Sequence, residues 1–313
     1  MGTAEETFTA VRPRLLALAY RMLGSATDAE DMVSETYLRW HAADREAITV
    51  PAAWLTKVLT NLCLNHLSSA RVRREQYVGQ WLPEPLLDGD EMLGPAGSAE
   101  LRDSVSLAVL VLLDQLAPRE RAVYVLREAF GFPHSEIAEM LQISEANSQQ
   151  LLRRARAKVD QRPATVELDP GQAREAVERF LAAAATGKVE PLIELLTADV
   201  VSVGDGGGVV PARLRPIVGA GQVAVFLRGL FKATPAQLAL IGGKPTGYLA
   251  WINGSPALLL AIGDRVVGAL SFQFADGPDH RISALRAFVN PAKLGRLDGA
   301  WKPAPGEDPI LVL

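Results

Sequence analysis

Cysteine is nearly absent from this chain of 313 residues, in which Cys63 stands alone. An intrachain disulfide is therefore excluded, and so is a zinc site built from cysteines. Long apolar runs are missing as well, and the opening residues MGTAEETFTA carry no basic start before an apolar segment, so neither a membrane span nor a signal peptide is predicted. We expect a cytoplasmic protein that needs no metal ion or other cofactor.

Positive charge is also scarce overall, because the net charge is -4. The charge is unevenly distributed, however. Between Glu145 and Arg162 five basic residues stand against two acidic ones, a local excess that suits a DNA-binding element. Since 49% of the residues are hydrophobic, a chain of this length can form two or three domains with a core each.

Helical periodicity dominates about the first 160 residues. Apolar residues recur at one-face spacing over 15–22 and 32–40, the second of these helices starting at Thr27 or Asp28, and a third helical run extends from Pro51 to about Glu75. A change of composition follows, because residues 80–100 contain five acids, three prolines and no base. We interpret this stretch as a linker, after which helices resume from about Leu101 to Val159.

The last 150 residues have a different pattern. Asp169 is expected to cap a helix that Gly187 ends, and a short helix follows to about Leu196. Strand-like runs separated by Gly, Asn and Asp turns are then predicted at 200–203, 238–241, 247–252, 257–262, 266–274 and 282–288. Helices followed by antiparallel strands predict an α+β sheet curled over its helices.

The strongest local signal is a helix-turn-helix pattern between His134 and Val159, with Ser144 as the cap of the second helix. Amides bond adenine edges and guanidinium groups bond guanine edges or phosphates, which is the chemistry that DNA recognition needs. A helical hairpin with a solvated basic face explains the same pattern and remains an alternative. The second helix is expected to expose Asn147, Gln149, Gln150, Arg153 and Arg154.

Two earlier helices carry polar residues at helical spacing. Asp31, Glu35 and Arg39 recur every four residues, which simple solvation with weak ion pairing also explains. The following run presents polar side chains about a turn apart and ends in a basic tail. Its polar and basic residues are Asn61, Asn65, His66, Arg71, Arg73 and Arg74.

Taken together and in their order along the chain, these segments resemble bacterial RNA polymerase sigma factors of the extracytoplasmic-function group. The runs RLLALAYRMLGSATDAEDMVSETYLRW and AWLTKVLTNLCLNHL look like the two halves of sigma region 2, and LAPRERAVYVLREAFGFPHSEIAEMLQISEANSQQLLRRARAKV looks like region 4. The resemblance implies that the first run docks on the clamp helices of core polymerase through Asp28, Asp31, Glu35 and Arg39.

The same resemblance implies where promoter DNA binds. Asn61 falls where the family captures an unstacked base of the minus-ten element, at a turn before the basic helix, and Asn65 with Arg71, Arg73 and Arg74 lies beside it. An amide next to a basic helix can bond a flipped base while the phosphates are neutralised. The second helix of region 4 is then expected to read the minus-thirty-five element.

Three short motifs resemble a narrower subgroup, the sigma-J type, whose carboxyl-terminal extension is a SnoaL-like domain of the nuclear-transport-factor-like superfamily. The motifs are WLPEPLL from Trp81, DGGG from Asp205 and NPAKL from Asn290. Val209 and Ala292 depart from the lysine and aspartate that the subgroup usually has, Gln149 replaces a common arginine, and Pro133 replaces a serine.

The WLPEPLL segment is apolar and stiffened by prolines, and so short a linker cannot bury it by itself. We expect it to dock on the third domain, so that the extension regulates promoter binding within one chain. The residues expected to form this regulatory contact are Trp81, Leu82, Pro83, Glu84, Pro85, Leu86, Asp205, Gly206, Gly207, Gly208, Asn290, Pro291, Lys293 and Leu294.

The expected organisation is multidomain: two all-α domains that bind polymerase and DNA, the second with the helix-turn-helix, then an α+β cone of the SnoaL-like type. The boundaries are 1–76 for region 2, 77–100 for the linker, 101–162 for region 4 and 168–313 for the SnoaL-like domain. We predict a sigma factor, not an enzyme, that binds core RNA polymerase and promoter DNA and no membrane.

An alternative is a ligand-binding or catalytic SnoaL-like module fused to a DNA-binding regulator. Catalysis would need a general base in a pocket, for which Asp199, Asp205 and His280 are the candidates. Asp205 precedes three glycines and is expected to bond its own turn, and His280 is expected to be exposed and unpaired.

Overall fold

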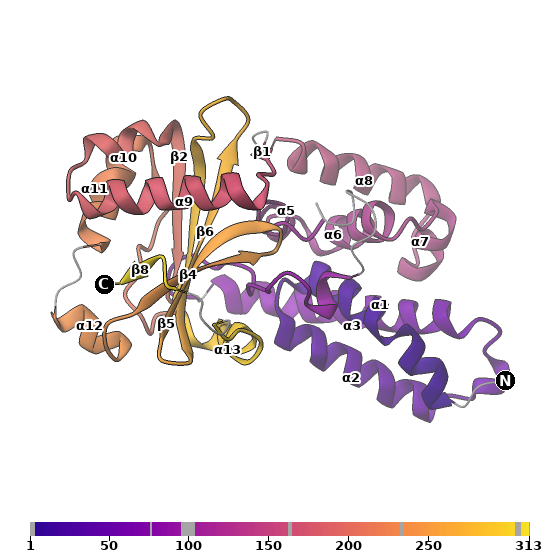
Figure 1. Cartoon of the computed structure of the whole chain (residues 1–313). Coiled ribbons are helices and arrows are strands. Elements are labelled where there is room, and N and C mark those ends of the chain that lie inside the picture. Colours follow the sequence, from indigo (N-terminus) through magenta and orange to yellow (C-terminus); the bar gives the residue numbers. More distant parts are fainter. Residues whose placement is uncertain are drawn as a thin grey trace. The chain divides into compact units, whose positions relative to one another are not determined.

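The computed structural model describes residues 4–75, 77–94, 104–161, 165–231, 235–303 and 308–312. The chain divides into two compact units, and Figure 1 shows the elements of both. The first unit, called here the helical unit, consists of residues 1–76 and 88–162. The second, called the sheet unit, consists of residues 77–87 and 163–313.

Three long helices begin the helical unit: α1 (Ala4–Leu23), α2 (Ala26–Ala42) and α3 (Pro51–Glu75), with a short 3-10 turn at Arg45–Ala47. Helix α2 starts earlier than Thr27 or Asp28, because the Ser25 side chain accepts a hydrogen bond from the Asp28 amide and caps the helix. The sequence-based start was therefore wrong. An edge-to-face contact between Phe8 and Tyr37 joins α1 to α2.

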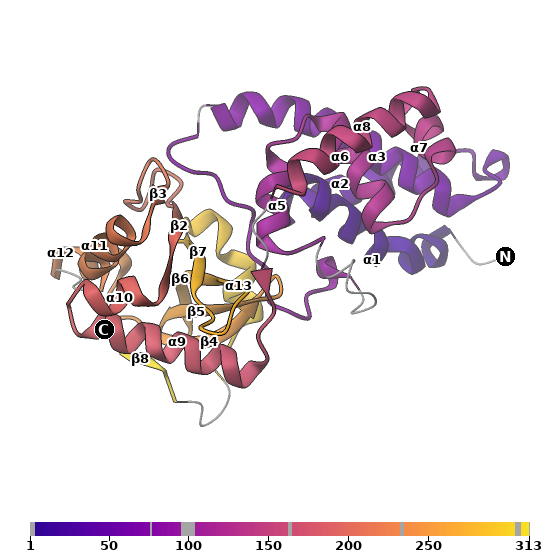
Figure 2. The ribbon, with the colours of Figure 1, turned by 90° about the horizontal axis from the view of Figure 1, so that it is seen from above.

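The second group of helices carries the helix-turn-helix, as Figure 2 shows. After a 3-10 turn at Glu91–Leu93 come α5 (Leu107–Asp114), α6 (Pro118–Tyr124), a π-helical segment (Val125–Ala129), α7 (His134–Leu141) and α8 (Glu145–Val159). Helix α7 begins after Pro133 without a side-chain cap and ends at Gln142, which has φ +53°. Ser144 caps α8 by accepting from the Asn147 amide, as predicted.

Buried arginines join these two groups of helices within the helical unit. The Arg21 guanidinium donates to Ser104 Oγ at 2.9 Å, and Arg121 of α6 donates to the Arg21 carbonyl at 3.3 Å. Burial lowers the pKa of Arg121 to about 9 and that of Arg21 to about 10. Burial also raises the pKa of the neighbouring Cys63 thiol, which is fully enclosed.

The sheet unit contains one curved sheet with the strand order β3-β2-β7-β6-β5-β4-β8, and β1 pairs with β6. The strands are β1 (Thr165–Val166), β2 (Leu196–Asp205), β3 (Ile217–Val218), β4 (Thr246–Ile252), β5 (Ser255–Ile262), β6 (Arg265–Ala275), β7 (Ile282–Phe288) and β8 (Leu311–Val312). The predicted α+β fold is confirmed.

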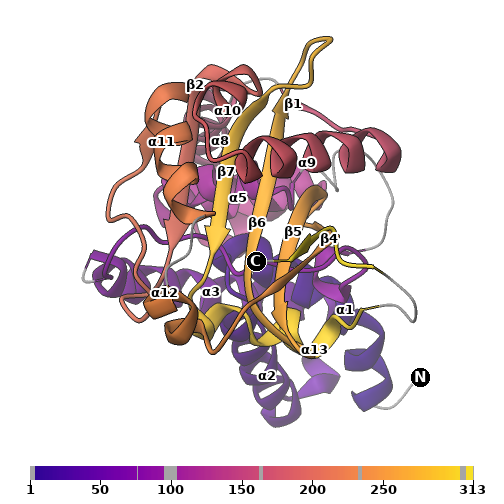
Figure 3. The same cartoon turned by 60° about the vertical axis from the view of Figure 1, so that its left-hand side comes forward.

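Helices α9 (Pro170–Ala185), α10 (Glu190–Glu194) and α11 (Ala220–Leu230) cover one face of this sheet, and α9 runs across the strands in Figure 3. Val177 and Phe180 of α9 and Val223 of α11 pack with Leu258 and Phe272 of the strands in one core. The opposite face carries a 3-10 turn (Pro291–Lys293) and α13 (Gly295–Ala300), after which Trp301 contacts the Tyr248 ring at 5.0 Å.

Two expectations about this sheet were wrong. Residues 238–241 belong to a helix, α12 (Pro235–Ile241), and not to a strand. The apolar run LALI fits a strand and a buried helical turn equally well, and Pro235 at the first position favours the helix. In addition, β2 and β7 pair in parallel, whereas β4, β5, β6 and β7 form consecutive antiparallel pairs.

In the described part of the chain, no helix combines the length and hydropathy needed to cross a bilayer.

Candidate functional site

Helix α2 places three of the four predicted polymerase-binding residues along one outer face. Asp31 is exposed, and Glu35 and Arg39 form an ion pair at 3.0 Å one turn further on. Leu38 lies beside them with 61% of its surface exposed. The sequence analysis missed Leu38, although an apolar residue seven positions after Asp31 was the available signal. A single exposed apolar side chain is normal on a protein surface, so Leu38 adds contact area to this face and does not by itself mark a docking site.

Asp28 has a different environment from the other three. Its carboxylate lies 3.3 Å from His66 Nε2 of α3. This contact joins the start of α2 to α3, so the partly exposed Asp28 side chain lies against α3. Its expected role at a polymerase surface stays a prediction.

Asn61 and Asn65 are exposed on α3. The resemblance placed Asn61 at a turn before a basic helix, but α3 is one continuous helix from Pro51 to Glu75, so that expectation was wrong. The Asn61 amide nitrogen donates to the Lys57 carbonyl at 2.9 Å, which leaves its oxygen facing solvent. The side chains of Arg71, Arg73 and Arg74 lie outside the described residues.

Helix α8 exposes the side chains expected to read DNA: Asn147, Gln149, Gln150, Arg153 and Arg154. Ser148 on the opposite side is buried, and its hydroxyl lies 2.9 Å from His134 Nδ1, which fixes α8 on α7. Arg153 bonds Gln150 at 3.0 Å, so these two side chains form one unit on the surface. Arg156, by contrast, is held by Glu128 at 2.9 Å.

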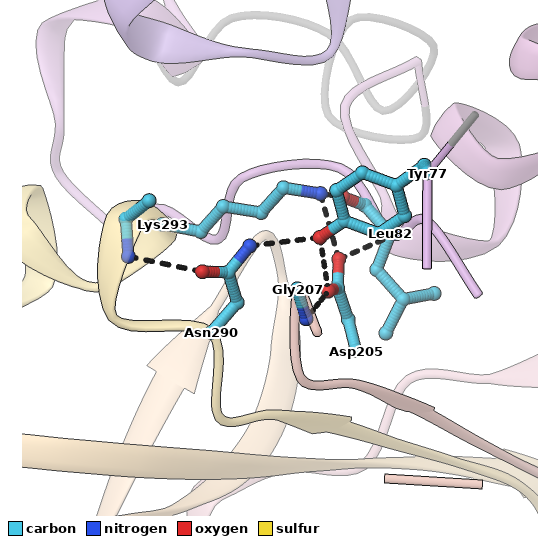
Figure 4. A network of polar contacts seen from close by, with 7 residues as sticks. Tyr77, Leu82, Asp205, Gly207, Asn290 and Lys293 are labelled. Atoms are coloured by element: carbon cyan, nitrogen blue, oxygen red, sulfur yellow. Dashed lines mark hydrogen bonds and ion pairs between the residues drawn. The ribbon is translucent and has the colours of Figure 1, made fainter. Parts of the chain in front are cut away.

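A buried polar site in the sheet unit, called here the linker site, is built around Asp205 at the end of β2. Asp205 is fully buried, and its Oδ1 accepts from the Tyr77 hydroxyl at 2.5 Å and the Gly207 amide at 3.1 Å. Its Oδ2 accepts from the Leu82 amide at 2.9 Å and pairs with the Lys293 ammonium at 2.7 Å. Figure 4 shows these contacts.

Lys293 and Asn290 complete the linker site from the NPAKL segment. The Lys293 ammonium also donates to the Leu82 carbonyl at 2.5 Å and lies 4.2 Å from the centre of the Trp81 ring. Asn290 donates to the Tyr77 hydroxyl at 2.8 Å. Burial and the hydrogen bond to Asp205 raise the pKa of Tyr77, so its hydroxyl stays a donor.

A second pair of hydrogen bonds holds the far end of the same segment. The Leu86 main-chain amide donates to Asn253 Oδ1 at 2.9 Å, and the main-chain amide of Asn253 donates to the Leu86 carbonyl at 3.0 Å. Asn253 is fully buried with φ +51°. The sequence analysis interpreted Asn253-Gly254 only as a turn and did not name Tyr77, so both contacts were missed.

The glycines of DGGG are required by close contacts. A Cβ on Gly207, where φ is +61°, would lie 2.5 Å from the Asn290 side chain, and one on Gly206 would lie 2.0 Å from the Val210 carbonyl. Val209 and Ala292, two of the departures from the subgroup pattern, have exposed side chains. The Ala292 main-chain amide donates to Asn290 Oδ1 at 3.1 Å and so supports the linker site through the backbone. The ion pair with Asp205 uses Lys293 instead.

A cavity of about 220 Å³ lies between the helix-covered face of the sheet and α11 and α12. Among its lining residues, only Ser202 and Arg213 have polar side chains. Neither Asp199 nor His280 lines it, and Asp205 is occupied in the linker site. His280 is half-buried with an unpaired Nδ1, whereas an exposed ring was expected. Over the described ranges, no group of histidine, cysteine and acidic side chains fits a metal ion.

Comparison with known proteins identifies the class. The family models for sigma-70 region 2 and for sigma-70, region 4 match residues 7–73 and 106–159. An extracytoplasmic-function RNA polymerase sigma factor of Mycobacterium tuberculosis is 39% identical over 254 residues, covering 79% of this chain and 81% of its own. The chain belongs to the extracytoplasmic-function family of RNA polymerase sigma factors.

Within this family, one similar relative is SigJ of M. tuberculosis, the protein of 39% identity. Its crystal structure superposes with a TM-score of 0.68 at 32% identity and covers 92% of this chain and 96% of that one. A probable sigma factor of the same organism, SigI, is 32% identical over 292 residues, 91% of this chain and 93% of its own length. The similarity therefore extends through the sheet unit as well as the helical unit.

Proposed function

We propose that this chain binds core RNA polymerase, directs it to specific promoters, and adjusts that activity through the sheet unit of the same chain. Membership of the sigma family supports the first part. The outer face of α2, with Asp31, Glu35 and Leu38, is the proposed polymerase contact. The exposed side of α8 is the proposed reader of the upstream promoter element, and Asn61 the proposed ligand of a flipped base.

The helical unit is proposed to open before it engages a promoter. In the structure α3 packs against α6 and α7, and Lys57 of α3 lies 3.5 Å from Glu139 of α7. The minus-ten and minus-thirty-five elements are roughly 25 base pairs apart, which corresponds to roughly 80 Å along DNA. Helices in direct contact cannot occupy both elements, so α7 and α8 have to move away from α3.

One observation supports the proposed regulation within the chain: Asp205 is buried and bonds Tyr77 and Leu82 of the linker segment. The segment Tyr77–Leu87 connects the region 2 helices to the region 4 helices, yet its hydrogen bonds go to the sheet unit. When the segment is docked on the sheet unit, the freely moving chain between the two groups of helices is shorter. Since the length of free chain sets their effective concentration, docking and release alter how readily both engage one promoter.

Run-off transcription with core polymerase tests this proposal. Asp205→Asn removes the charge that pairs with Lys293 while keeping the size of the side chain, so we expect altered transcript yield with unchanged binding to core polymerase. Asp199→Asn is the control, because Asp199 lies on the same strand and is exposed. Equal yields from the wild type and Asp205→Asn would exclude regulation through the linker site.

The sheet unit is proposed to act without catalysis. Its cavity has no acidic or histidine side chain in the lining, and the one fully buried carboxylate of the predicted candidates, Asp205, already accepts from two amides, a hydroxyl and an ammonium. A general base needs a free lone pair directed at substrate. Because its proposed partners are core polymerase and promoter DNA, the chain is proposed to work in the cytoplasm.

A further inference from the structure

We infer that the cavity of the sheet unit binds a small monocarboxylic acid with an apolar body of about ten heavy atoms. This inference concerns the sheet unit alone and does not depend on the proposed regulation. It rests on the size and apolar lining of the cavity, on one hydroxyl in its wall and on one guanidinium among its lining residues.

Shape and lining define the apolar body. The cavity is bounded by Leu258, Leu260 and Leu270 of the sheet and by Phe226 and Leu230 of α11. Its volume of about 220 Å³ exceeds the ~150 Å³ that holds one benzene molecule in an engineered apolar cavity. Apolar side chains around an unfilled space lose van der Waals contacts that a ligand restores. A chain of eight to ten carbons or a fused ring pair is of this size, whereas a peptide helix is far too wide.

Ser202 supplies a polar group within the cavity. It is 7% exposed and lies on β2 opposite Ile217 of β3, and both residues line the cavity. A hydroxyl in the wall of an otherwise apolar cavity can donate to a ligand oxygen.

Arg213 determines the charge of the ligand. Its guanidinium lies 5.5 Å from the centre of the Phe226 ring, a contact that restrains the side chain, and it pairs with no carboxylate in the described part of the chain. Arg213, Ile217, Phe226 and Leu230 line both the cavity and an adjoining surface groove, so the guanidinium stands where the cavity opens. A planar guanidinium binds a carboxylate through two parallel hydrogen bonds.

The surroundings of the opening agree with an apolar molecule entering from water. Val225 and Leu230 on α11, which line the groove at the opening, are 51% and 44% exposed. Exposed apolar side chains gathered at the rim of a cavity favour an amphipathic ligand, with its apolar body inside and its carboxylate at the rim.

Isothermal titration of the full chain with decanoic acid and with decan-1-ol tests the inference. We expect one molar equivalent of decanoic acid to bind, about tenfold or more tightly than the alcohol, because a charge-assisted pair is lost with the carboxylate. Arg213→Gln should weaken binding of the acid to the level of the alcohol, and Arg213→Lys should restore part of the difference. Arg228→Gln is the control, since Arg228 is exposed on α11 outside the cavity lining.

Two further variants fill the space itself. Ala287→Leu adds volume in the cavity wall, and Leu230→Trp blocks the opening from a partly exposed position. Both should abolish binding of acid and alcohol while the thermal melting temperature stays the same or rises. Binding retained by both variants would place the ligand elsewhere. Equal affinities for acid and alcohol with no effect of Arg213→Gln, or no binding of either compound, would overturn the inference.

Discussion

The ammonium of Lys293 lies 2.7 Å from the carboxylate of Asp205, a residue with no exposed surface, and the same ammonium donates to the Leu82 carbonyl. One cation therefore neutralises a buried charge and also holds the linker segment. Because the ion pair and the segment share this group, loss of the lysine removes both functions at once.

Lys293→Met should release the segment Tyr77–Leu87. Removing one partner of a buried ion pair typically costs ~3–5 kcal/mol, because the other charge is left uncompensated. We expect hydrogen exchange of the Leu82 and Leu86 amides to become much faster. Lys302→Met is the control, since the Lys302 ammonium is exposed and bonds the Asp264 carbonyl, away from the linker site. Unchanged protection in Lys293→Met would show that the ion pair does not hold the linker.

Tyr77 should make docking of the linker sensitive to alkaline pH. Its pKa is raised by burial and by the hydrogen bond to Asp205, so the docked state favours the neutral phenol. The contribution to docking is complete below the ordinary tyrosine pKa of about 10 and is lost as pH rises through the raised value. Phenolate absorbance should show a late titration step that belongs to Tyr77.

Two variants separate this effect from general alkaline unfolding. Tyr77→Phe should remove the late step of the titration, and Tyr37→Phe should retain it. A late step that persists in Tyr77→Phe would assign the raised pKa to another residue.

Reversing the charges of Asp31 and Glu35 should weaken binding to core polymerase by about tenfold or more, because like charges then face the partner. The matched control is Glu175→Lys with Glu178→Lys on α9, where Glu178 also pairs with an arginine four positions away. Co-elution with core polymerase measures the effect. If the α2 variant and the control co-elute equally, the outer face of α2 is not the contact.

Alanine at Gln149, Arg153 or Arg154 should alter binding to the upstream promoter element. A side chain that reads a base should cost about 1 to 3 kcal/mol and relax specificity at one position, whereas a phosphate contact should lower the salt dependence. Arg156→Ala serves as the control, because its guanidinium bonds Glu128. Unchanged footprints for all three variants would mean that another element reads the promoter.

A covalent link between α3 and α7 should block promoter binding. Cysteines at Lys57 and Glu139, whose side chains meet at 3.5 Å, can be joined by a short bismaleimide. The native Cys63 is buried and its pKa is raised, so it should not compete for the reagent. We expect the linked protein to lose promoter binding and the unlinked double variant to retain it. Promoter binding by the linked form would contradict the required opening.

Local signals predicted the helical elements well. The cap at Ser144 and the start of α9 after Asp169 depend on side chains within three residues of the helix end, and both agree with the structure. The three motifs of the linker site were also visible in the sequence, as were the residues exposed on α8. The start of α2 and the state of residues 238–241 were wrong, because neighbouring signals of similar strength competed there.

Apart from residues 238–241, the sequence by itself determined the main helical segments and which helix carries amides and arginines outward, since these depend on spacing. It also determined that WLPEPLL needs a covering surface, because exposing apolar groups costs free energy. Only the tertiary structure decided what Asp205 does. A carboxylate after a strand is a turn former by local rules, and its pairing with Tyr77, Leu82 and Lys293 joins positions far apart in the chain. The parallel pairing of β2 with β7 and the cavity beside Ser202 arose in the same way, because both depend on how the sheet curves around its helices.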